Sequence, residues 1–71
     1  MAIDIKAPMP GIIMEILVDE GYTVRRDDEL LILEAMKMEN PIRSPEDGIV
    51  KTILVRKKDF VDTDQIIMSL E

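Results

Sequence analysis

Gly11–Val18 reads GIIMEILV, and Gly48–Val55, 37 residues further along the chain, reads GIVKTILV. These two stretches decide the fold. Both begin with a glycine after a turn signal, and both are rich in Ile, Leu and Val, as is typical of β-strands. Two similar strands in one short chain predict two copies of a larger structural unit.

The same offset aligns the chain on itself without a gap. Identical residues fall together outside the two stretches as well, among them Pro8 with Pro45, Val24 with Val61, Asp27 with Asp64, and Leu33-Glu34 with Leu70-Glu71. Several matches in one register indicate two half-repeats, at about residues 5–34 and 42–71. A chain of 71 residues is long enough for one small domain, so we expect a single domain over residues 1–71.

Short apolar runs separated by Pro, Gly and Asp predict an all-β fold. The expected strands are Ile3–Ala7, Ile12–Val18, Leu30–Ala35, the residues around Ile42, Ile49–Val55 and Ile66–Leu70. Each half alone would leave one apolar face in water, so we expect a flattened barrel or sandwich in which the halves pack face to face. The predicted core includes Ile16, Leu17, Val24 and Leu33 with their counterparts Ile53, Leu54, Val61 and Leu70.

The composition excludes several classes of function. The chain has no histidine and no cysteine, which removes the usual zinc sites and the Ser/His/Asp and Cys/His catalytic groups. We therefore expect no metal site and no self-contained enzyme. The net charge of −6 would repel nucleic acid. No apolar run is long enough to span a bilayer and no leader is recognisable, so we predict a cytoplasmic location, or an organelle matrix for a piece of a larger eukaryotic enzyme.

The segment that joins the two repeats holds a single lysine between two methionines. Residues 34–39 read EAMKME. The strand that ends at Ala35 runs into Met36-Lys37, and Met38 begins the return, which predicts a hairpin with a two-residue turn. Such turns favour Gly and Asn, so we expect strain of roughly 1 kcal/mol at each of the two turn positions.

The residues alone leave two interpretations of Lys37 open. At a hairpin tip its amine would be exposed and able to attack an activated acyl group, which would make it a modification site. Surface lysines usually serve only as solubilising charges, and methionines usually fill gaps in a core.

Ala35-Met36-Lys37-Met38 resembles the attachment motif of biotinyl carrier domains, the biotin carboxyl carrier members of the biotin/lipoyl attachment family. Ala7–Gly11 and Ser44–Gly48 resemble the opening segments of the two halves, so the resemblance covers nearly the whole chain. It implies a barrel-sandwich hybrid, which is a flattened barrel of two four-stranded antiparallel sheets with quasi-twofold symmetry.

The resemblance also assigns roles to individual residues. It implies that a biotin protein ligase attaches biotin covalently to Lys37, within the motif formed by Ala35, Met36 and Met38. Glu34 would assist recognition by the ligase, although exposed carboxylates are often ordinary solvated charges, the interpretation favoured for Glu39. For Met38, packing at the base of the hairpin is an equal alternative.

The implied function is that of a non-catalytic carrier. Biotin on Lys37 would carry an activated carboxyl group between a biotin carboxylase site and a carboxyltransferase site of a biotin-dependent carboxylase or decarboxylase. One rival is a lipoyl carrier of a 2-oxo acid dehydrogenase-type complex, but such domains usually have an acidic residue before the lysine and a small one after it. Another rival is an unmodified adaptor module of the same fold.

The chain departs from the family pattern in its turns. The family often has Gly-Asp before the third strand of each half, where this chain has Gly21-Tyr22 and Lys58-Asp59. Glycine is also common where Asp27 and Asp64 stand. A left-handed backbone suits glycine and is tolerated by Asp, so strain is expected chiefly at Lys58.

Overall fold

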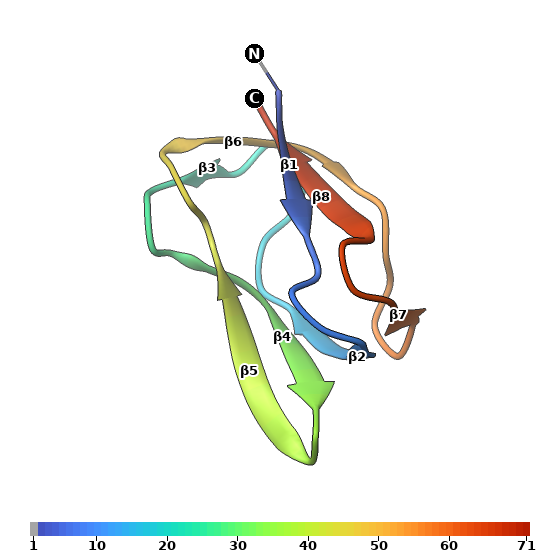
Figure 1. The fold of residues 1–71 in the computed structure, drawn as a ribbon. Helices are drawn as coiled ribbons and strands as arrows, with labels where there is room; N and C mark the ends of the chain where they lie inside the picture. The colour runs from blue at the N-terminus through green and yellow to red at the C-terminus, as the bar shows by residue number, and fades with distance from the viewer. Residues whose placement is uncertain (1) are drawn as a thin grey trace.

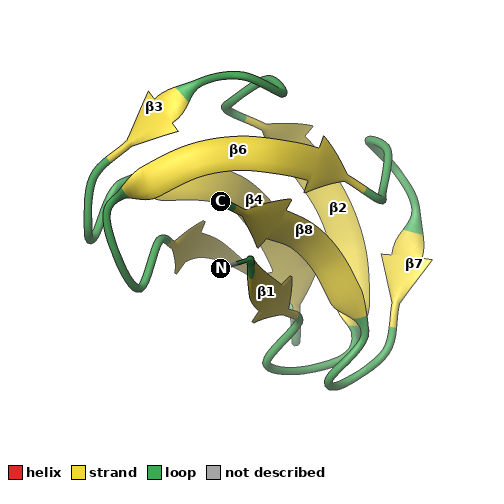
Figure 2. Cartoon of the chain, turned by 90° about the horizontal axis from the view of Figure 1, so that it is seen from above, coloured by secondary structure: helices red, strands yellow, loops and turns green. Residues whose placement is uncertain are grey.

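The computed structural model describes residues 2–71, which form two four-stranded sheets (Figures 1 and 2). The strand order is β1-β8-β6-β3 in one sheet and β5-β4-β2-β7 in the other, and every neighbouring pair is antiparallel. The eight strands are β1 (Ile3–Lys6), β2 (Gly11–Ile16), β3 (Thr23–Val24), β4 (Glu29–Ala35), β5 (Met38–Arg43), β6 (Gly48–Ile53), β7 (Phe60–Val61) and β8 (Ile66–Leu70). The predicted all-β fold is confirmed.

The internal repeat is visible in the backbone as well as in the sequence. The 37-residue offset carries β2 onto β6 and β3 onto β7, and it carries one sheet order onto the other. Irregularities repeat too, because the β2–β4 ladder shifts between Ile13 and Glu15 and the β6–β8 ladder shifts between Val50 and Thr52. The quasi-twofold symmetry therefore extends to local β-bulges, which are designed features of a strand rather than defects.

The prediction that the two halves pack face to face is wrong. Each sheet contains two strands from each half, so the halves interleave and the sheets pack instead. Two pairings cause this arrangement. The hairpin keeps β4 and β5 in one sheet, and β1 pairs with β8 so that the first and last strands share the other.

Four of the eight predicted core positions are fully buried. Leu33, Val61 and Leu70 have no exposed surface, and Val24 is 2% exposed. Ile16 and Ile53 are partly buried against this core. The prediction for Leu17 and Leu54 is wrong, since these side chains are 43% and 56% exposed.

The two exposed leucines follow from the alternation of a strand. Leu17 and Leu54 come directly after β2 and β6, and each donates its backbone N–H to the facing chain, at the carbonyl oxygens of Leu30 and Ile67. Successive side chains then point to opposite faces. The inward positions fall to the next residue in each repeat, which is valine in both, and both valines are buried.

The turns adopt the backbone that the sequence predicted. Gly21 has φ of 93° and its counterpart Lys58 has φ of 78°, while Asp27 and Asp64 also have positive φ. The N–H of Gly21 donates to the carbonyl of Val50 at 2.8 Å, and that of Lys58 donates to Ile13 at 2.6 Å. These equivalent hydrogen bonds hold both turns in the left-handed region, which favours glycine over lysine.

The molecule is elongated, with principal extents of 32 × 17 × 17 Å. Ile3 pairs with Leu70, so the two ends of the described chain lie together at one end of the long axis, while the β4–β5 hairpin forms the other end (Figure 1). The segment with the lysine between methionines therefore stands far from both chain ends.

Candidate functional site

The β4–β5 hairpin closes through a two-residue turn. Ala35 pairs with Met38 across the last rung, and Met36 and Lys37 span the gap with φ of 53° and 64°. Positive φ at both central residues defines a type I′ turn, whose twist matches that of the flanking strands. The predicted turn is confirmed, including its unusual use of two residues other than Gly or Asn.

The tip side chains are free of the protein body. Met36 is 89% exposed, Met38 is 66% exposed, and Lys37 between them is exposed as well. Neither of the two ion pairs among residues 2–71 involves Lys37. The alternative in which Met38 packs at the hairpin base does not hold, because a side chain in a packed base would be covered.

The stem below the tip is rigid. Ala35 is only 5% exposed and Leu33 is fully buried, so the core reaches to the residue before the turn. A Cβ atom on Gly11 would lie 2.4 Å from the carbonyl oxygen of Glu34, so glycine is what lets β2 pass this close. The side-chain amide of Asn40 also donates to the backbone carbonyl of Met38 at 3.1 Å. An exposed side chain thus stands on a tightly packed base.

Two carboxylates face each other across the stem. Glu34 pairs with Glu39 in the register of β4 and β5, and both are exposed. Like charges directly opposite each other are destabilising, so their pairing here is not explained by stability. From the sequence alone, a solvated charge is the favoured interpretation of Glu39. The equal distance of the two residues from the turn was the signal that could have identified them as a pair.

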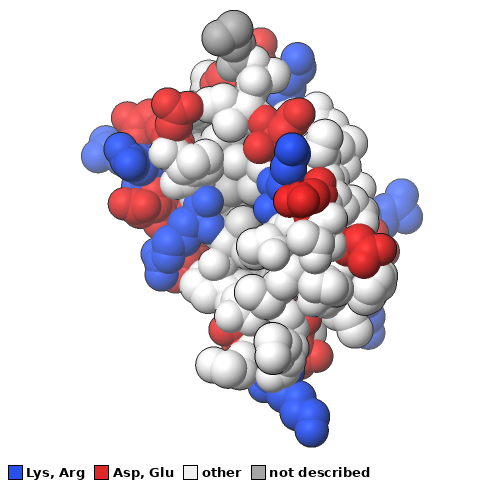
Figure 3. Space-filling model, in the orientation of Figure 1, with Lys and Arg blue, Asp and Glu red and all other residues white. Residues whose placement is uncertain are grey.

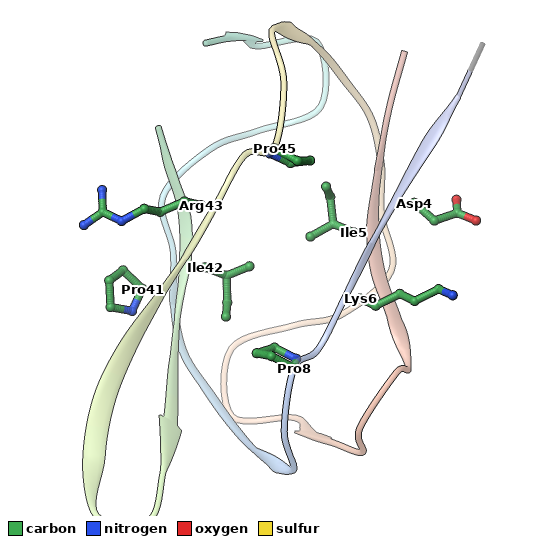
Figure 4. A pocket seen from close by; sticks show the side chains of 8 residues that line it. All are labelled: Asp4, Ile5, Lys6, Pro8, Pro41, Ile42, Arg43 and Pro45. Carbon is green, nitrogen blue, oxygen red and sulfur yellow. The ribbon is translucent and has the colours of Figure 1, made fainter. Parts of the chain in front are cut away.

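A groove on another part of the surface lies between the edge strands β1 and β5 (Figure 4). Its volume is about 400 Å³, and its lining consists of symmetry-related pairs, which are Asp4 with Pro41, Ile5 with Ile42, Lys6 with Arg43, and Pro8 with Pro45. Ile5 and Ile42 point into the groove in Figure 4. Figure 3 shows that the middle of this face is largely uncharged and that charges gather around it. The sequence alone does not predict the groove, because it does not show which strands pair with β1 and β5.

The hairpin tip offers one group that can be acylated, the primary amine of Lys37. Among residues 2–71, no group of three or more acidic, His or Cys side chains is arranged to hold a metal ion. The same residues include no helix long and apolar enough to cross a membrane. An exposed amine on a rigid hairpin can be acylated and can then present the attached group to other molecules.

The chain is similar in sequence to parts of known proteins. Residues 3–70 match the family model described as "Biotin-requiring enzyme". Pyruvate carboxylase of Staphylococcus aureus (strain Mu50 / ATCC 700699) is 42% identical over 67 residues, which are 94% of this chain and 6% of that protein. The gamma subunit of methylmalonyl-CoA decarboxylase of Veillonella parvula is 52% identical over 46 residues, which are 65% of this chain and 36% of that subunit.

Two solved structures share the fold. A single-chain, multi-domain long-chain acyl-CoA carboxylase has a TM-score of 0.91 and 25% identity over 96% of this chain and 7% of its own. The urea carboxylase of Kluyveromyces lactis has a TM-score of 0.95 and 24% identity over 100% of this chain and 6% of its own. The matches therefore cover 6–7% of the three carboxylases and 36% of the decarboxylase subunit.

Proposed function

We propose, from the premise that this chain belongs to the biotin/lipoyl attachment family, that Lys37 carries covalently attached biotin. The chain is a biotinyl carrier domain of the type found in biotin-dependent carboxylases. One observation carries the assignment to Lys37: this exposed lysine lies at the tip of a two-residue turn, on a stem that joins the two repeats and in which Leu33 and Ala35 are buried.

The chemistry of the tip fits this group. A biotin protein ligase would present biotin as an activated acyl group, and the Nζ atom of Lys37 would attack its carbonyl carbon. An amide bond forms, the activating group leaves, and the amine gives up a proton. Exposed Met36 and Met38 leave the amine open to the enzyme on both sides. Ala35 is small enough to be covered at the end of the stem, which fixes where the turn begins.

The proposed role of the domain is to carry, not to catalyse. When bound, biotin supplies a ring nitrogen that accepts a carboxyl group at one active site and gives it up at another. The hairpin holds the point of attachment away from the body of the domain, and tethering raises the local concentration of the cofactor at each site. The acid, base and metal would come from the partner enzymes, a biotin carboxylase and a carboxyltransferase.

The parent activity that we propose is that of a biotin-dependent carboxylase or decarboxylase, as in the relatives. Residues 1–71 would form one carrier domain of such an enzyme. Its proposed compartment is the cytoplasm or an organelle matrix, for which the lack of cysteine is suitable. A lipoyl carrier is the second candidate, because the family includes lipoyl domains.

Intact-mass measurement tests the proposal. The chain is co-expressed with a biotin protein ligase or with a lipoyl ligase, and each product is weighed and then digested to locate the adduct. We expect a single biotinyl adduct on Lys37 with the first ligase and an unmodified chain with the second. A lipoyl adduct would favour the rival carrier, and an unmodified chain in both cultures would favour the adaptor.

A further inference from the structure

Outside the hairpin tip, the internal symmetry gives the surface residues of one sheet matched counterparts on the other sheet. We call the sheet β5-β4-β2-β7 the hairpin sheet, because it contains the β4–β5 hairpin. Five residues on its outer face form what we call the hairpin-sheet patch, and they are Ile12, Met14, Ile32, Pro41 and Phe60. Their counterparts on the outer face of the other sheet are Ile49, Lys51, Ser69, Asp4 and Thr23. At four of these five pairs, the hairpin sheet has an apolar residue where the other sheet has a polar or charged one.

This difference is a property of the surface. Core pairs such as Leu33 and Leu70 are apolar in both repeats, since both are buried. Phe60 is the only phenylalanine in the chain, and it is 62% exposed where Thr23 stands in the first repeat. An apolar cluster on only one of two equivalent outer faces indicates an interaction surface. The fold itself does not require apolar residues there, because the equivalent face of the other sheet has mostly polar ones. The contrast ends toward the far end of the sheets, where Ile66 is the counterpart of Glu29.

The patch is continuous with the stem of the hairpin. In the register of the sheet, Phe60 pairs with Ile12, Ile12 with Glu34, and Glu34 with Glu39. With strands about 4.8 Å apart, this row crosses roughly 14 Å of surface and lies roughly 10 Å below the tip. An enzyme that receives the tip would rest its edge on this row.

Charged residues surround the patch in the way that they surround a protein–protein interface. Glu15 pairs with Lys57 at 3.5 Å and Glu29 with Arg43 at 3.2 Å on the sides away from the tip. On the side toward the tip, Glu34 and Glu39 take part in neither ion pair. A complementary surface therefore needs an apolar area with basic side chains at one border.

We propose that the hairpin-sheet patch is the docking surface for the biotin protein ligase that modifies Lys37, an inference that rests on the proposed function. The distance that the reacting group can reach from the tip favours the ligase over the enzymes that act after it. Before acylation, Lys37 has only its own side chain to reach an active site, so the ligase must approach the stem closely. After acylation, the arm is longer, and the later enzymes reach its end from a greater distance.

Steady-state biotinylation tests the docking surface. The unmodified chain is the varied substrate for purified ligase with ATP and biotin, and three patch residues are replaced by what their counterparts carry, in Met14→Lys, Ile32→Ser and Phe60→Thr. The matched control is Ile49→Ser on the other sheet. We expect the triple variant to raise the KM for the chain about tenfold or more with kcat little changed, and the control to change KM less than about twofold.

The outcomes separate the two proposals. An unmodified wild-type chain would overturn the proposed function itself. Normal labelling with an unchanged KM in the triple variant, or an equal loss in the control, would overturn only the docking surface. A wild-type dimer that the triple variant converts to a monomer, measured by light scattering, would assign the patch to a second copy instead. If the triple variant does not fold, Met14→Lys and Phe60→Thr are measured singly against the same limits.

Discussion

The two repeats end on the same dipeptide and then differ. Leu33-Glu34 and Leu70-Glu71 occupy equivalent places, and both leucines are fully buried. After Glu34 the chain continues into the hairpin that carries Lys37, whereas the equivalent strand β8 ends at Leu70 beside β1. The barrel is thus made of two copies of one structural unit, and the reactive lysine occurs once, in the hairpin that joins the first copy to the second. Features that both repeats share serve the fold, and features found in only one of them are candidates for the function.

The largest expected effect is a complete loss of biotinylation without a loss of the fold. Lys37→Arg should abolish biotinylation entirely, because a guanidinium does not replace the amine as an acyl acceptor. Lys37 is exposed and outside both ion pairs, so the melting temperature should stay within about 2 °C of wild type, since 1 kcal/mol corresponds to roughly 4–8 °C here. Intact mass and thermal unfolding measure the two results. Lys51→Arg is the control and should be labelled normally, and a residual adduct on the Lys37→Arg chain would contradict the assignment.

The next effect is a loss of stability of the fold, and it should be similar for equivalent core residues of the two repeats. Leu33→Ala and Leu70→Ala each remove a fully buried side chain and should each lower the free energy of unfolding by about 2–5 kcal/mol. Urea unfolding measures both. Leu17→Ala is the comparison, and we expect a cost below about 1 kcal/mol because Leu17 is 43% exposed. A near-neutral Leu70→Ala beside a damaging Leu33→Ala would show that the two copies do not share one core.

A smaller effect on stability is expected at two equivalent glycines, Gly11 and Gly48, and it should differ between the two repeats. A Cβ on Gly11 would lie 2.4 Å from the Glu34 carbonyl oxygen, while a Cβ on Gly48 would lie 3.1 Å from that of Glu71. Gly11→Ala should therefore cost about 2–3 kcal/mol, near the upper end of overpacking costs, and Gly48→Ala about 1 kcal/mol. Urea unfolding measures the difference. Equal costs would mean that the stem of the hairpin is no more tightly packed than its counterpart.

The smallest effect tests a turn in which the repeats differ. Lys58 has φ of 78° where the first repeat has Gly21, so Lys58→Gly should stabilise the protein by about 0.5–1 kcal/mol. The reciprocal change, Gly21→Ala, should destabilise it by about 1–2 kcal/mol because it places a Cβ in a left-handed backbone. Differential scanning calorimetry resolves both. A loss of stability in Lys58→Gly would show that the lysine side chain contributes more than its backbone costs.

Much of this architecture was predictable because it rests on local patterns. The ungapped repeat predicted the symmetry, the apolar runs predicted six of the strands, and the spacing around Met36-Lys37 predicted a two-residue turn. These features depend on neighbouring residues, so a single sequence contains them.

What was missed depends on pairing at long range. The two-residue strands Thr23–Val24 and Phe60–Val61 are too short to show alternation, and they exist only because β6 and β2 pair with them. The interleaving of the halves likewise depends on β1 meeting β8. Leu17 and Leu54 were assigned to the core by hydrophobicity alone, although their strands had already ended. The opposition of Glu34 and Glu39 required the register of the hairpin.

The pairing of β1 with β8 also orders events in time. Of the eight strands, β1 is synthesised first and its partner β8 last, so β1 stays unpaired until the other seven strands have been made, and β7, which carries Phe60, is the last but one. Contacts between such distant segments form slowly, because a long loop must close first. The hairpin itself is local and can form early, but the surface around it is completed last. A ligase that recognises this surface would act on domains that have folded and pass over unfolded ones, so that biotin is attached only to carriers able to use it.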